Sequence, residues 1–151
     1  MSTIVMAANH PTHLEMMKVL LEYTGEHQVV SMCTDGLTAL AHVYARMPDL
    51  VVIDIDRPGS DGLDLIRRMR DGGYNQPVLA VSSACMSRTA RRAGKAGASG
   101  LVHKTALLGE LTVAARVLLQ GGVYFPAYVR YGGPLTASER VRSSEKRLAF
   151  C

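Results

Sequence analysis

Short apolar segments alternate with longer amphipathic segments along most of the chain. The apolar segments are rich in β-branched residues and predict strands over residues 3–7, 28–32, 50–55, 77–82 and 100–103. Between them, apolar side chains recur every three or four positions and predict helices over residues 13–23, 37–46, 63–70, 88–95 and 108–119. A strand that is apolar at successive positions, as at residues 50–53, is typical of a parallel sheet with helices on both faces. The pattern therefore predicts five successive strand–helix units in an α/β fold.

The strand–helix alternation ends near residue 126. We expect residues 1–126 to form one domain and residues 127–151, which begin with a stretch interrupted by Gly and Pro, to form a linker and a polar helical start. Thr136 is predicted to cap that helix, with Glu139 three residues later completing a capping box.

The composition agrees with a globular domain, because 48% of the 151 residues are hydrophobic and 20% are charged. These values exclude a disordered chain, and no apolar run approaches the roughly 20 residues of a membrane-spanning helix. The N-terminus lacks the pattern of a signal peptide, so we expect a cytoplasmic protein with no membrane partner. Cys33, Cys85 and Cys151 form neither a CxxC pair nor a zinc-binding spacing and are expected to be reduced thiols.

The net charge of +4 is unevenly distributed. Residues 1–126 carry 12 Lys and Arg against 11 Asp and Glu, whereas residues 127–151 carry 5 against 2. A basic tail of this kind is a weak indication of an acidic partner or of a nearby nucleic-acid-binding module.

Polar side chains are predicted to gather where the strands end. In an open parallel sheet, ligands bind beyond the carboxyl ends of the strands, next to the point where the strand order reverses. The residues at these positions are Ala8, Asn9, His10, Asp54, Asp56, Ser82, Ser83, His103 and Lys104. We interpret His10 as a loop histidine beside the first helix, since neither a second metal ligand nor a phosphorelay-type helix accompanies it.

The segment around Asp54 has a specific pattern. It reads DLVVIDIDRPGSDGLDLIRRMR, and the chain also carries Asn9-His10-Pro11, PVLAVSS and an AGASGLVHK that ends at Lys104, in matching order and spacing. Over residues 3–126 the chain resembles the receiver domains of response regulators. It is most similar to the NarL/FixJ-like subgroup, whose output domain is a LuxR-type helix-turn-helix, and residues 135–140 (LTASER) resemble the opening of that domain.

The resemblance implies a (βα)5 flavodoxin-like, CheY-like fold, a three-layer sandwich around a five-stranded parallel sheet. It implies that Asp54 is the phospho-acceptor and that Ser82 and Lys104 contact the phosphoryl group, whose charge the family neutralises with Mg²⁺ and this lysine. DNA would be bound by an output domain of which residues 127–151 hold only a truncated start, or which is absent. Whether the chain is a fragment of a longer regulator stays open.

The metal pocket departs from the family pattern. The family has two adjacent acidic residues where this chain has Ala8 and Asn9, which leaves Asp54 as the charged ligand, assisted by the Asp56 carbonyl and the Asn9 amide. Because Mg²⁺ prefers carboxylate and water oxygens, this degenerate pocket predicts weak or absent Mg²⁺ binding and poor phosphorylation. The side chain of Asp56 either turns inward and partly compensates or is solvated in its loop.

Two further features concern the conformational change by which receivers of this family respond to phosphorylation. Leu101 stands at the switch position, where the family commonly has Tyr or Phe. In the family this ring changes position when the Ser or Thr hydroxyl, here that of Ser82, moves toward the phosphoryl group, and Leu101 has no ring that could do so. Asp54 and Lys104 could also form a purely structural ion pair. We therefore expect a receiver that is held in one state or is switched by something other than phosphate.

Three helices present candidate interaction surfaces. The first and last helices carry a second apolar stripe, which predicts a homodimer through Met16, Val19, Tyr23, Val113 and Val117. The alternative is that these are scattered surface residues. The fourth helix places four cations on one face, which is either solvated or a docking face for acidic side chains or DNA phosphates: Arg88, Arg91, Arg92 and Lys95.

Together these features predict an atypical receiver domain that controls transcription through dimerisation and an attached DNA-binding domain. A histidine kinase or another regulatory protein would be a further partner. We expect no enzyme and no cofactor, since the chain lacks a Gly-rich phosphate loop and a Ser–His–acid arrangement. Two alternatives are a stand-alone pseudo-receiver that acts through protein–protein contacts and an ordinary phospho-accepting receiver.

Overall fold

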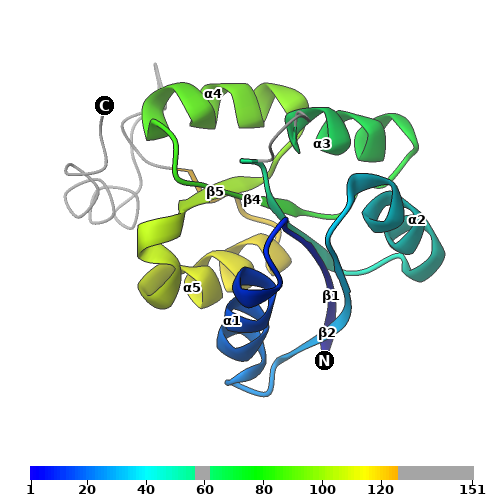
Figure 1. Ribbon diagram of the computed structural model, residues 1–151, viewed down its shortest axis with the longest axis vertical. Helices are drawn as coiled ribbons and strands as arrows, with labels where there is room; N and C mark the ends of the chain where they lie inside the picture. The colour runs from blue at the N-terminus through cyan, green and yellow to red at the C-terminus, as the bar shows by residue number, and fades with distance from the viewer. Residues whose placement is uncertain (57–61, 126–151) are drawn as a thin grey trace.

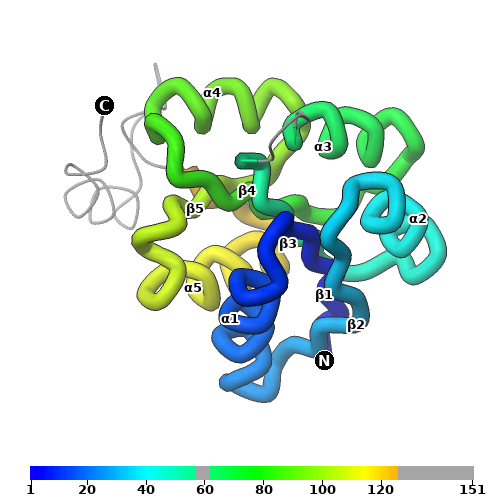
Figure 2. The backbone as a smooth tube through the Cα atoms, viewed as in Figure 1, coloured from blue at the N-terminus to red at the C-terminus, as the bar shows by residue number. Residues whose placement is uncertain are grey.

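The computed structural model describes residues 1–56 and 62–125 (Figure 1). The strands are β1 (Ser2–Ala7), β2 (His27–Cys33), β3 (Leu50–Asp54), β4 (Val78–Ser82) and β5 (Gly100–His103). The helices are α1 (Pro11–Glu22), α2 (Gly36–Arg46), α3 (Gly62–Asp71), α4 (Met86–Ala96) and α5 (Leu107–Leu119), with a 3-10 turn, η1 (Lys104–Ala106), before α5. All strand pairs are parallel and the sheet order is β2-β1-β3-β4-β5 (Figure 2). The predicted α/β fold with a five-stranded parallel sheet is confirmed.

Helices cover both faces of the sheet. The pair α1 and α5 lies on one face, and α2, α3 and α4 lie on the other (Figure 1). Because successive strand residues point to opposite faces, β1 places Val5 and Ala7 in the core under α2–α4 and Ile4 and Met6 in the core under α1 and α5. Both β3 and β4 are buried along their whole length, which explains their uninterrupted apolar sequences.

The predicted elements agree with the structure to within two residues at each end. The largest differences are at α1 and α4, which each begin two residues earlier than expected. Pro11 is compatible with the first position of α1, because the N–H groups of a first helical turn have no partner inside the helix. No side chain caps α4 at Cys85, so the sequence offered no start signal there.

Arg70 holds the loop after α3 against the end of α4. Its guanidinium donates to three backbone oxygens, those of Gly97 at 2.9 Å, Tyr74 at 2.7 Å and Gln76 at 2.6 Å. The Tyr74 hydroxyl in turn donates to the Pro48 carbonyl at 2.8 Å in the core. The sequence analysis gave Arg70 no role, because these acceptors are backbone atoms that only the fold brings together.

His27 gives the domain a predicted acid sensitivity. The side chain is buried at the start of β2, and neither ring nitrogen has a hydrogen-bond partner among the described residues. Burial lowers the pKa of His27 below 6.5, opposed by Glu26 and assisted by Arg116. The unfolded chain therefore binds the proton more tightly, and stability should decrease as the pH falls below 6.5.

We expect urea-denaturation midpoints of the wild-type chain to fall between about pH 7 and about pH 5. The His27→Leu variant should lose this part of the pH dependence, since it has no proton to bind at that position. An equally steep dependence in the variant would show that other groups cause it.

Cys33 and Cys85 differ in their chemical state. Cys33 is a buried free thiol, as expected. Cys85 is disulfide-bonded, so the expectation of a reduced thiol is wrong there, because sequence spacing does not report which distant residues the fold brings together. The linker and helix expected over residues 127–151, with Thr136 and Glu139, lie outside the described residues.

The described part of the chain folds into helices of 13 residues or fewer. None of its helices combines the length and the apolar composition that crossing a bilayer requires.

Candidate functional site

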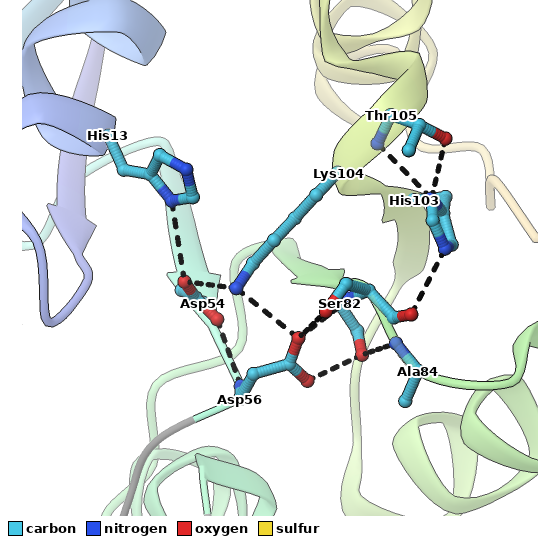
Figure 3. A network of polar contacts seen from close by, with 9 residues as sticks. His13, Asp54, Asp56, Ser82, Ala84, His103, Lys104 and Thr105 are labelled. Carbon is cyan, nitrogen blue, oxygen red and sulfur yellow. Dashed lines mark hydrogen bonds and ion pairs between the residues drawn. The ribbon is translucent and has the colours of Figure 1, made fainter.

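Polar side chains from three neighbouring strands converge at one edge of the sheet (Figure 3). Asp54 ends β3, Ser82 ends β4, and Lys104 follows the last residue of β5. Asp56 joins them from the loop after β3 (Figure 3). These residues meet because the carboxyl ends of parallel strands share one edge of a sheet. The structure thus brings together four of the residues that the sequence placed there, Asp54, Asp56, Ser82 and Lys104.

Asp54 is buried and paired with Lys104. Its carboxylate is 2% exposed, and Oδ2 lies 2.9 Å from the Lys104 ammonium nitrogen and 3.9 Å from Nδ1 of His13. The backbone N–H of Asp56 donates to Oδ1 at 2.9 Å. A buried carboxylate is tolerated when it is paired and hydrogen-bonded, and these contacts provide both conditions. The ion pair considered for Asp54 and Lys104 is present.

Asp56 turns inward, and its carboxylate is held by residues of β4 and the loop after it. Oδ1 accepts the Ser82 hydroxyl at 2.6 Å, and Oδ2 accepts the Ser83 backbone N–H at 2.6 Å and the Ser83 hydroxyl at 2.9 Å (Figure 3). Burial alone would raise the pKa of Asp56, but these hydrogen bonds and the nearby Lys104 outweigh it and lower the pKa. The solvated alternative for this side chain is therefore not the one observed.

Lys104 bridges the two carboxylates. Its ammonium nitrogen lies 2.9 Å from Asp54 and 3.3 Å from Asp56, and its side chain is 18% exposed. Burial alone would lower the pKa of Lys104, but its contacts with the two aspartates raise the pKa above the ordinary value. One ammonium group thus supplies positive charge to both acids.

The family's Mg²⁺ is poorly matched by the donors at this edge. Ala8 is buried and offers only a methyl group, and Asn9 contributes a neutral amide where the family has an acid. The carboxylates of Asp54 and Asp56 are already contacted by Lys104 and by hydrogen bonds. No group of three or more His, Cys, Asp or Glu side chains among the described residues could hold a metal ion. The donor set does not match the oxygen-rich, charged shell that Mg²⁺ prefers.

Two histidines lie beside this edge. His10 precedes α1 and packs edge-on against His13, with ring centroids 5.9 Å apart, in agreement with its interpretation as a loop residue. The sequence analysis did not single out His13, whose ring approaches Asp54. Its place in the first turn of α1, three residues after His10, is the signal that could have found it.

Leu101 and His103 are two further predicted residues, and both lie on β5. Leu101 is buried in the core under α2–α4, so the switch position is filled by an apolar side chain directed inward. His103 accepts the Thr105 backbone N–H at Nδ1 and lies with Nε2 3.2 Å from the Ser83 carbonyl oxygen (Figure 3). His103 therefore links the end of β5 to the loop that holds Asp56.

The predicted interaction surfaces are only in part exposed. Met16 and Val19 on α1 are exposed, as is Tyr23 directly after it, to 87%. Val113 and Val117 on α5 are partly buried against the core. The four cations of α4 are all exposed: Arg88, Arg91, Arg92 and Lys95. Leu108, at the start of α5 and 85% exposed, was not singled out from the sequence.

The fold and this edge define a class of protein. A five-stranded parallel sheet with a buried Asp at the end of β3, a Ser at the end of β4 and a Lys directly after β5 is a receiver-type architecture. The profile of the response regulator receiver domain matches residues 4–116. The chain belongs to this family, and the resemblance found in its sequence is confirmed.

Two relatives each match more than four fifths of this chain. It is 32% identical over 126 residues to the Fimbriae Z protein of Salmonella typhimurium, covering 83% of this chain and 60% of that protein. It is 33% identical over 124 residues to the virulence-factor transcription regulator BvgA of Bordetella pertussis, covering 82% and 59%. The chain thus spans about three fifths of the length of these two relatives.

Solved structures agree with this assignment. A LuxR-family two-component response regulator from Aurantimonas superposes with a TM-score of 0.78 at 26% identity, covering 97% of this chain and 98% of that one. The receiver domain of NarL from Mycobacterium tuberculosis superposes with a TM-score of 0.74 at 27% identity, covering 80% and 97%. The LuxR/NarL type expected from the sequence is confirmed.

Proposed function

We propose that this chain is an atypical receiver domain with weak or no Mg²⁺-dependent phosphorylation at Asp54, which controls transcription through dimerisation and an attached DNA-binding domain. The observation that carries the proposal is that both carboxylates of the site already have partners within the chain. Lys104 contacts both of them, and the Ser82 hydroxyl donates to Asp56. Ala8 and Asn9 supply no charge to hold the cation that phosphoryl transfer needs.

A titration with beryllofluoride, a phosphoryl mimic, tests this proposal. With up to about 20 mM Mg²⁺, far above the ordinary requirement of a charged site, we expect no saturable shift in the amide signals of Ser82, Ser83 and Lys104. The Asp54→Asn variant serves as the control for non-specific effects. Saturable shifts in the wild-type chain that Asp54→Asn abolishes would identify an ordinary phospho-accepting receiver instead.

Dimerisation is proposed to use the face formed by α1 and α5. The two helices are joined by the Thr112 hydroxyl, which donates to the Leu20 carbonyl at 3.2 Å. Val19 on α1 and Tyr23 directly after it are exposed. We expect the chain to sediment as a dimer at tens of micromolar and Tyr23→Glu to weaken the dimer at least about tenfold, because a carboxylate would be buried in an apolar contact.

A matched control for this experiment is Leu37→Glu. Leu37 is 73% exposed on α2, which covers the opposite face of the sheet, so this change should leave the sedimentation unaltered. A wild-type chain that sediments as a monomer, or a dimer insensitive to both Tyr23→Glu and Val117→Glu, would remove the proposed interface.

The partners proposed for the whole protein follow from its relatives. The output domain would bind DNA, a histidine kinase or another regulatory protein would act upstream, and the protein would work in the cytoplasm as a regulator and not as an enzyme.

The exposed cations of α4 favour one second function, a stand-alone pseudo-receiver that docks an acidic protein there. DNA binding by the full-length gene product, unaffected by Arg88→Ala and Arg92→Ala, would favour the transcriptional function over this one.

A further inference from the structure

The end of β4 and the start of η1 together form a small anion-binding arrangement. It consists of the Ser82 hydroxyl, the Ser83 backbone N–H and the Lys104 ammonium, three donors that all contact the Asp56 carboxylate. Figure 3 shows Ser82 and Lys104 on either side of Asp56. A hydroxyl, an amide and an ammonium that converge in this way are suited to oxygen atoms of a small oxyanion, either a carboxylate or a phosphoryl group.

The occupant of this arrangement belongs to the chain itself. Both oxygens of the Asp56 carboxylate are engaged, Oδ1 by Ser82 and Oδ2 by Ser83 and Lys104. A carboxylate offers about four acceptor positions. The described residues make four contacts with it, one to Oδ1 and three to Oδ2. The two hydrogen bonds at 2.6 Å are at the short end of the range, as expected when the acceptor is charged.

Asp56 is directed into the arrangement by its own backbone. Its N–H donates to Oδ1 of Asp54 at 2.9 Å, which fixes the loop two residues after β3. The Ser82 hydroxyl is fixed as well, because it also accepts the backbone N–H of Ala84 at 3.0 Å. Other hydrogen bonds thus fix both Asp56 and Ser82, which reduces the conformational entropy lost when their side chains form a hydrogen bond with each other.

We propose that the Asp56 carboxylate is a tethered substitute for the phosphoryl group that a receiver of this type would carry on Asp54, so that the anion site is filled without phosphorylation. This inference rests on the proposed weak or absent phosphorylation of Asp54 and gives it a cause within the chain. Because Asp56 is tethered, its effective concentration at the donors is in the millimolar range or above, and a free anion must compete against that.

Removal of the tethered carboxylate should therefore create a binding site for a free one. We expect sodium acetate to bind the Asp56→Ala variant of the full chain with saturable shifts of the Ser83 and Ala84 amide signals. Its affinity for the wild-type chain should be at least about tenfold lower. Sodium chloride at equal ionic strength separates binding from charge screening, and Asp64→Ala, which removes the carboxylate paired with Arg68 on α3, is the matched control.

A second pair of variants keeps the test decisive if the alanine variant is poorly folded. Asp56→Asn preserves the size of the side chain but not its charge, so acetate should bind it more weakly than Asp56→Ala and more tightly than the wild-type chain. Adding Lys104→Met to either variant should abolish acetate binding, since the cation of the site is then gone.

The outcomes distinguish this inference from the proposed function. If neither folded Asp56 variant binds acetate better than the wild-type chain does, Asp56 is only a structural cap of the loop after β4, and the inference fails while weak phosphorylation stands. If the wild-type chain takes up beryllofluoride with Mg²⁺, the proposed function fails, whatever the acetate result.

Discussion

Lys104→Met is expected to lower the free energy of unfolding by about 3–5 kcal/mol at neutral pH, because it removes one partner of a buried ion pair. Asp54 is 2% exposed, and among the described residues the Lys104 ammonium, at 2.9 Å, is the cation that pairs with it most closely. Methionine nearly preserves the volume of the side chain but leaves two carboxylates beside each other without that cation. Urea denaturation followed by circular dichroism measures the effect.

Two further variants make this measurement specific. Lys95→Met removes a cation from the exposed face of α4 and should change the free energy of unfolding by less than about 0.5 kcal/mol. Adding Asp54→Asn to Lys104→Met should restore part of the lost stability, since the unpaired buried charge is then removed. If Lys104→Met unfolded with the same midpoint as the wild-type chain, the pair would have no structural role.

Gly62→Ala is expected to lower the free energy of unfolding by about 3 kcal/mol, because the added methyl group meets backbone. A Cβ atom at Gly62 would lie 2.5 Å from Cα and 2.8 Å from the carbonyl oxygen of Ile55. Ile55 follows Asp54 directly, so the residues after β3 would have to shift. We therefore also expect the amide signal of Asp56 to move in this variant, which heteronuclear NMR detects.

Gly109→Ala is the matched control for this change. Gly109 is an exposed residue of α5, and a Cβ atom there would have no atom within 4 Å. Alanine in an exposed helix should stabilise the domain by about 0.5–1 kcal/mol relative to glycine. Equal destabilisation by both substitutions would show that close contact with Ile55 is not the cause.

The interpretation of Asp56 changes how the missing acids at Ala8 and Asn9 are understood. Without a divalent cation, two carboxylates at one edge need another source of positive charge, and Lys104 provides it to both. Asp56 then takes the hydrogen bonds that a phosphoryl oxygen would otherwise receive from Ser82. The loss of the metal ligands and the inward turn of Asp56 are therefore consistent parts of one arrangement.

The sequence by itself predicted the order and type of the elements and the edge of the sheet at which the polar residues meet. Both follow from local patterns: apolar runs such as residues 50–53 must be covered on two faces, and parallel strands share the edge at which they end. Asp54, Ser82 and Lys104 were identified in the same way. Their positions depend on the strands, and the strands depend on burial that the pattern of apolar residues reports.

The tertiary structure alone decided the direction of the side chains around that edge. Asp56 could have been solvated, and it turns inward because Ser82, Ser83 and Lys104, far from it in sequence, supply donors there. His13 faces Asp54, and Arg70 binds the carbonyl oxygens of Tyr74, Gln76 and Gly97, for a similar reason. Polar contacts between distant residues need partners placed to within a fraction of an ångström, which hydrophobic periodicity does not encode.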